Sequence, residues 1–121
     1  MTINKEFIVD LIKKYDNYNG FENVISYIQA HWKLTNPLYP KGYTYHIFTL
    51  KLDLTNLSGT TFKPIDQITN NDIETWCTET LDTNQRLGIE NAAINTIKES
   101  HEFNSMTVYY QNPDSASLGI F

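Results

Sequence analysis

The chain has 121 residues, a formal net charge of −5 at pH 7 and 40 % hydrophobic residues, 13 % of all residues being aromatic, so one domain over residues 1–121 with its own core is predicted. This composition argues against disorder, and no apolar stretch approaches the roughly 20 residues of a membrane-spanning helix. The first residues mix charges into their apolar positions, unlike a secretory signal, and a cytoplasmic location is predicted.

The first two predicted elements are helices, over residues 4–16 and 21–32. In both segments apolar residues recur at i, i+3 and i+4, the rhythm of one buried helical face. The first stripe contains Phe7, Ile8, Leu11, Ile12 and Tyr15, and the second Phe21, Val24, Ile25, Ile28 and Trp32. Asn19-Gly20 between them is a hairpin signal only where strands flank it, so the glycine is interpreted as a helix end.

A loop and a strand follow. Two prolines and a glycine predict a loop over residues 33–42. Residues 43–54 are rich in β-branched and aromatic side chains and alternate in polarity, which predicts a strand. Residues 60–63 form a possible antiparallel return strand that ends before Pro64.

The second half is predicted to repeat the order helix, helix, strand. A third helix begins near Asn71, which lies three residues before Glu74 in the manner of a capping box. A fourth helix covers residues 88–100, and a strand covers residues 105–111. The last residues, 115–121, are short and end in apolar side chains, so an edge strand or a frayed end is expected. The predicted fold is therefore α+β, with two helix pairs packed on a small antiparallel sheet of three or four strands.

Two stretches of the sequence resemble one another: "NGFEN" at residues 19–23 and "LGIEN" at residues 87–91. Each falls where one predicted helix ends and the next begins, so both are interpreted as corners in which glycine permits the turn. Three shared identities are too few to support an internal repeat in so biased a composition. A duplication of the helix-helix-strand order remains an alternative to coincidence.

Few residues carry an evident chemistry. Cys77 lies on the apolar stripe of the third helix among acidic neighbours, which disfavours a reactive thiolate and indicates a buried thiol. As the chain's single cysteine it also fits a reducing compartment. The three histidines show no metal-ligand spacing, and phosphate-binding, nucleophile-elbow and calcium-loop patterns are missing. The sequence therefore favours a non-enzymatic protein with no cofactor and no metal.

The acidic second half gives the strongest functional signal. Residues 1–63 hold seven lysines and five acids, a balance of +2, and residues 64–121 hold nine acids against Arg86 and Lys98, a balance of −7, which together give −5. We expect an acidic helical face that binds a basic protein, as in an inhibitor or immunity-type protein. Its carboxylates are those of Glu74, Glu79, Asp82 and Glu90. With a single arginine and an acidic balance, direct binding of nucleic acid is disfavoured.

Two alternatives stay open. The first is a small-ligand domain or modest enzyme with a pocket formed by Tyr43, Tyr45, His46 and Tyr110. The second is a structural subunit of a larger assembly, such as a phage particle, which would form homo-oligomers. His46 is interpreted more readily as a histidine at the rim of the core than as a catalytic base.

Overall fold

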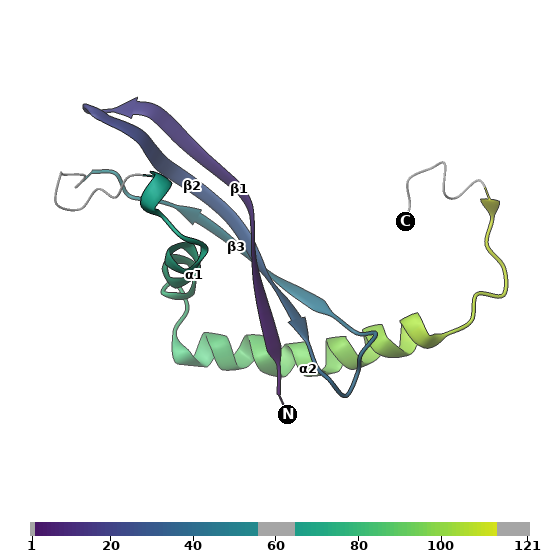
Figure 1. Ribbon diagram of the computed structural model, residues 1–121. Coiled ribbons are helices and arrows are strands. Elements are labelled where there is room, and N and C mark those ends of the chain that lie inside the picture. The colour runs from purple at the N-terminus through teal and green to yellow at the C-terminus, as the bar shows by residue number, and fades with distance from the viewer. Residues whose placement is uncertain (1, 56–64, 114–121) are drawn as a thin grey trace.

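The computed structural model describes residues 2–55 and 65–113, arranged as a sheet with helices on one of its faces. The strands are β1 (Asn4–Tyr18), β2 (Phe21–Thr35) and β3 (Thr44–Lys51), which form an antiparallel sheet of order β1-β2-β3. A short 3-10 helix, η1 (Ile65–Gln67), leads to α1 (Asn70–Thr78) and α2 (Thr83–Ser105). Figure 1 shows α2 lying across the strands and α1 beside it under the same sheet. The predicted α+β class is confirmed.

The two helices predicted over residues 4–16 and 21–32 are wrong, because these residues are β1 and β2, the arms of one long hairpin. Two β-bulges explain the error. The register shifts between Val9 and Leu11 and between Lys13 and Lys14 leave Asp10 and Ser26 as extra residues in their strands. A bulge lengthens the spacing along one face from two residues to three, so that Ile25 and Ile28 both point into the core. Strand spacings of two and three thereby imitate the rhythm of a helix.

The turn of this hairpin is Asn19-Gly20, with φ of 51° at Asn19 and 88° at Gly20. Positive φ at both central residues is required by the type I′ turn of two-residue hairpins, and Asn-Gly is its preferred sequence. The interpretation of residues 19–23 as a helix corner is therefore wrong. Residues 87–91 lie inside α2, so they are not a corner either. The helix-helix-strand order does not recur, and the basis for a duplication is lost.

For the later elements, the structure agrees more closely with the prediction from sequence. The strand predicted over residues 43–54 is confirmed as β3, and both helices of the second pair exist. The first of them is capped by Thr69 and Asp72 rather than by Asn71 and Glu74. The second is longer than residues 88–100, because Asp82 and Gln85 form a capping box that starts it earlier. The strand predicted over residues 105–111 is wrong.

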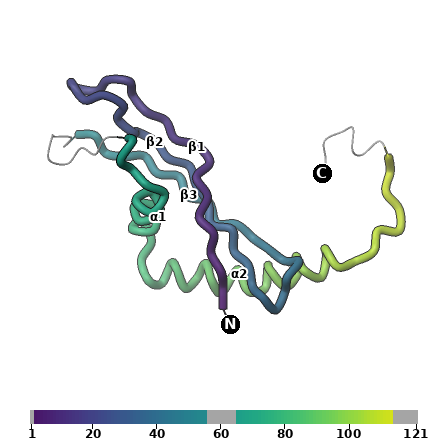
Figure 2. Tube along the Cα trace, viewed as in Figure 1, coloured from purple at the N-terminus to yellow at the C-terminus, as the bar shows by residue number. Residues whose placement is uncertain are grey.

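That last segment begins as the end of α2 and continues without regular secondary structure. Figure 2 shows the chain after α2 curving away from the sheet. The predicted strands at residues 60–63 and 115–121 lie outside the described residues.

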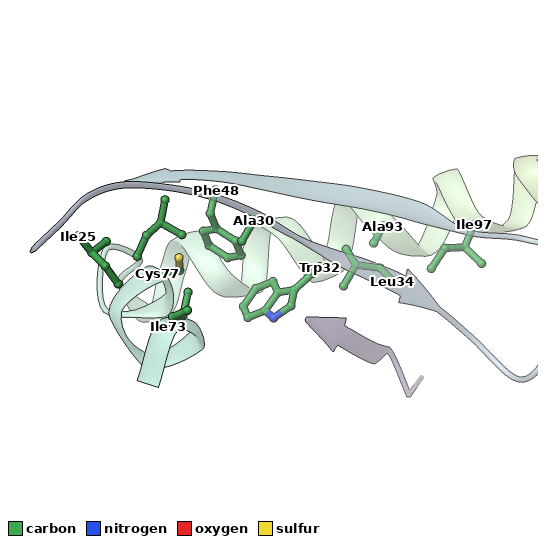
Figure 3. Packing of buried hydrophobic residues seen from close by; sticks show 10 residues of the cluster. Ile25, Ala30, Trp32, Leu34, Phe48, Ile73, Cys77, Ala93 and Ile97 are labelled. Carbon is green, nitrogen blue, oxygen red and sulfur yellow. The ribbon is translucent and has the colours of Figure 1, made fainter. Parts of the chain in front are cut away.

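The core lies between the sheet and the helices. Alternate residues of β2 are buried, with Trp32 near the centre, and Phe48 of β3 packs edge-on against its ring at 4.9 Å. Figure 3 shows these side chains with their helical neighbours. The buried cluster consists of Ile25, Ile28, Ala30, Trp32 and Leu34 from β2, Phe48 from β3, Ile73 and Cys77 from α1, and Ala93 and Ile97 from α2. None of the described helices is long and apolar enough to cross a membrane.

Candidate functional site

Two of the four carboxylates proposed from sequence are engaged around Trp32. The indole Nε1 of Trp32 donates a hydrogen bond to Oε2 of Glu74 at 3.1 Å. Lys5 forms an ion pair with Glu90 at 2.5 Å, and its ammonium lies 4.9 Å from the centre of the Trp32 ring. This arrangement joins β1, β2, α1 and α2 through one lysine and one tryptophan. The carboxylate of Glu90 is therefore already paired with a cation of the protein itself, and that of Glu74 with an indole N–H.

The other two carboxylates flank the connection from α1 to α2. Glu79 is the residue that ends α1, and its side chain is exposed. Asp82 caps α2: Oδ1 accepts a hydrogen bond from the backbone N–H of Gln85 at 2.8 Å. Arg86 lies at the same connection, where its guanidinium donates to the carbonyl of Thr78 at 2.9 Å. The structure thus divides the four carboxylates between the surroundings of Trp32 and the connection from α1 to α2.

The residues of the proposed pocket are divided between the two faces of the sheet. His46 faces the core side, where its ring meets Phe48 at 4.8 Å, and burial lowers the pKa of its imidazole. Tyr43 and Tyr45 face the opposite side and lie 5.5 Å apart. Tyr110 belongs to the segment after α2 and is 76 % exposed. These four side chains do not meet in one pocket.

A groove of about 190 Å³ lies between β3 and α2. Thr44, Tyr45 and His46 line it from β3, and Ala92 and Thr96 are among the residues that line it from α2. Small residues on the helix leave this space beside the edge of the sheet. Its volume suits one side chain rather than a drug-sized ligand, for which about 300–1,000 Å³ is usual.

The face of the sheet opposite the helices carries large exposed side chains, and we refer to it as the open face. Ile47 is 65 % exposed there, beside the half-exposed Tyr45. Lys33 and Lys13 lie over tyrosine rings, at 5.3 Å from Tyr43 and 5.8 Å from Tyr27. Among the residues that the register of the strands assigns to it are Glu6, Ile8, Leu11, Lys13, Tyr15, Val24, Tyr27, Gln29, His31, Lys33, Tyr45, Ile47, Thr49 and Lys51.

An aspartate-histidine pair lies at the centre of the open face. Oδ2 of Asp10 is 2.7 Å from Nδ1 of His31, and the imidazole meets the Tyr45 ring edge-on at 5.2 Å. Asp10 is the extra residue of the β1 bulge, a feature that commonly redirects a side chain. Together with Gln29 and Ile47, these residues line a hollow of about 250 Å³. The site combines fixed polar groups with an apolar wall.

The remaining candidates are structural or unrelated. Cys77 is fully buried as a free thiol, and burial together with the neighbouring Glu74 carboxylate raises its pKa, as expected of an unreactive cysteine. In the described part of the chain, no three His, Cys, Asp or Glu side chains gather as metal ligands would. A further hollow of about 400 Å³ lies near Tyr15, Tyr18 and residues 51–55 and contains none of the predicted site residues.

The Asp10–His31 pair was not predicted from the sequence, because both residues were assigned to helices. Two signals were present: Asn19-Gly20 as a hairpin turn, and the alternation of residues 28, 30, 32 and 34. Comparison with known protein families, with curated proteins and with solved structures finds no match to this chain.

Proposed function

We propose that the protein is a non-enzymatic protein-binding module, and that the open face is its main contact surface. The observation that supports this is the combination on one uncovered sheet face of Tyr45, Ile47 and the Asp10–His31 pair. Binding energy in protein interfaces concentrates in buried aromatic residues that surround a few fixed polar groups. Large side chains are seldom left to water in this density without a partner.

A protein partner is favoured over a small molecule by the shape of the hollow. At about 250 Å³ the space beside His31 is shallow and suits a single partner side chain. The strand backbone and the neighbouring tyrosines would then contact the partner around that anchor. Lys13 and Lys33 lie over tyrosine rings, so their stems extend the apolar surface and their charges remain at its rim.

The acidic second half belongs to the same proposal as a steering element. The net charge of −5 favours encounter with a basic partner, such as the target of an inhibitor or immunity-type protein. Glu79 is the carboxylate best suited to this role, because Glu74, Asp82 and Glu90 each bond to the protein itself. A cytoplasmic location is part of the proposal and is supported by the buried free thiol of Cys77.

The test begins with the protein recovered from its native host and a partner identified by native mass spectrometry. Binding of that partner is then measured for Ile47→Ser and for Leu87→Ser. Both side chains are large, apolar and exposed, but Leu87 is on α2 and away from the open face. We expect Ile47→Ser to raise the dissociation constant about tenfold, equivalent to about 1.4 kcal/mol of binding free energy, and Leu87→Ser to leave it unchanged.

A third variant separates contact from steering. Glu79→Lys is expected to slow association and to reduce its dependence on salt, with little effect on dissociation. A loss of binding in Glu79→Lys with none in Ile47→Ser would transfer the contact surface to the acidic helical side and overturn the proposal.

A further inference from the structure

The segment that follows α2 is apolar and strand-like, yet its side chains are exposed over residues 106–111. Tyr109 is fully exposed, and Met106, Val108 and Tyr110 are each at least two-thirds exposed. Residues 106–111 alternate in the pattern of a strand, contain no charge and are rich in β-branched and aromatic side chains. A segment of this composition is expected to bury its side chains in a sheet rather than leave them in water.

The sheet offers two edges, and they differ in protection. β1 carries charged residues at Lys5, Glu6, Lys13 and Lys14 and has a bulge at Asp10, features that discourage a further strand from pairing. β3 has neither a bulge nor a proline, and Lys51 is its only charged residue. In residues 2–55 and 65–113, no strand pairs with the outer edge of β3. β3 is therefore the receptive edge.

The space beside β3 fits one face of an added strand. The groove between β3 and α2 lies next to Thr44 and His46 and is lined on the helix side by Ala92 and Thr96. One side chain on the inner face of an added strand would enter this groove. Side chains on the other face would join Tyr45 and Ile47 on the open face, because alternate residues of a strand point to opposite sides.

The segment is badly placed to reach the β3 edge of its own chain. Asn104 donates to the carbonyl of Lys41 at 2.8 Å, and the backbone N–H of Lys41 donates to His101 at 3.1 Å. These bonds fix the end of α2 at the loop that precedes β3. Met106 then leaves the helix with extended backbone angles, φ −73° and ψ 145°, and no glycine or asparagine follows before Asn112 to turn the chain back. The chain after α2 runs away from the sheet (Figure 1).

We infer that residues 106–111 of one copy pair as a fourth strand with the outer edge of β3 in a second copy. Each copy then supplies one strand and one edge, and the backbone bonds of β3 continue across the interface. The pairing closes as a reciprocal dimer or continues as a chain of copies. This inference concerns self-association and does not rest on the partner proposed for the open face.

The test compares full-length Val108→Pro with full-length Val108→Thr. Proline removes a backbone N–H and does not fit a paired strand, whereas threonine keeps both the N–H and the β-branched shape. Val108 is 70 % exposed, so neither change disturbs the core. Mass measured by light scattering over a concentration series should rise above the monomer for the native protein and for Val108→Thr. For Val108→Pro, the protein concentration at which the mass rises above the monomer should increase about tenfold or more.

Amide hydrogen exchange identifies the edge that is used. The backbone amides of β3 that point away from β2, and alternate amides of residues 106–111, should become protected together as the native protein assembles, and should remain unprotected in Val108→Pro. A native protein that stays monomeric at all concentrations would overturn the inference. So would an assembly unaffected by Val108→Pro, one that protects β1 instead of β3, or a monomer in which residues 106–111 are already protected.

Discussion

At the scale of single residues, Gly42 is the described glycine with the least room for a side chain. It is buried where the loop after β2 meets α2, and a Cβ built on it would overlap the backbone carbonyl of Ile97. A backbone atom cannot move aside as a flexible side chain can, so the loop or the helix would have to shift. Gly88 is the opposite case, since it is exposed within α2 and an added methyl group would meet nothing within 4 Å.

These two glycines form a matched pair for mutation. Gly42→Ala is expected to lower the free energy of unfolding by about 1–3 kcal/mol, as overpacking does. Gly88→Ala is expected to raise it by about 0.5–1 kcal/mol, because alanine loses less backbone freedom in a helix. Urea denaturation of both variants measures the difference. Equal effects of the same sign would contradict the close contact between Gly42 and α2.

At the scale of secondary-structure elements, the sequence predicted those whose signals are local and regular. The alternation of residues 43–54 identified β3, and both helices were predicted, the first from near Asn71 and the second over residues 88–100. The hairpin was missed because Asp10 and Ser26 interrupt the two-residue period of β1 and β2. A bulge depends on pairing with another strand, so one strand's sequence does not reveal it. The same bulge positions Asp10 beside His31, which is why the center of the open face was also missed.

The start of α2 gives the prediction at this scale. Asp82→Ala removes the side chain that accepts from the N–H of Gln85, and should lower the free energy of unfolding by about 1 kcal/mol. Glu79→Ala, three residues earlier and exposed, should change it by less than about 0.5 kcal/mol. Thermal denaturation followed by circular dichroism compares the two. If both variants were equally stable, Asp82 would be better explained by partner binding than by capping.

At the scale of the whole molecule, stability is distributed unevenly. Residues 25–34 of β2 contribute to the core on the face that packs against the helices. The hairpin extends beyond the helices to the turn at Asn19-Gly20. Side chains from Lys13 to Asn17 are exposed, and Ile28 and Ile97 are completely buried. A region with few buried contacts opens at a smaller free-energy cost than the core does.

The free energy of native-state amide exchange should therefore differ between the turn end and the base of the hairpin. Paired amides of residues 15–22 are expected to exchange by local opening, and those of residues 28–34 only by global unfolding. Added denaturant should accelerate the second group strongly and the first group little. Measurement at low protein concentration avoids protection by self-association. A single exchange free energy along β2 would show that the hairpin opens as one unit.

The bond between Lys5 and Glu90 has a consequence for the order of events during synthesis. Lys5 leaves the ribosome long before Glu90, its partner in the ion pair. The indole N–H of Trp32 likewise has its acceptor, Glu74, only after α1 has been synthesised. The hairpin can zip together early, but its base gains these contacts only when the last helix has emerged. Nascent chains arrested before α2 should therefore contain the paired hairpin with its apolar face exposed to solvent, a state that chaperones are expected to bind.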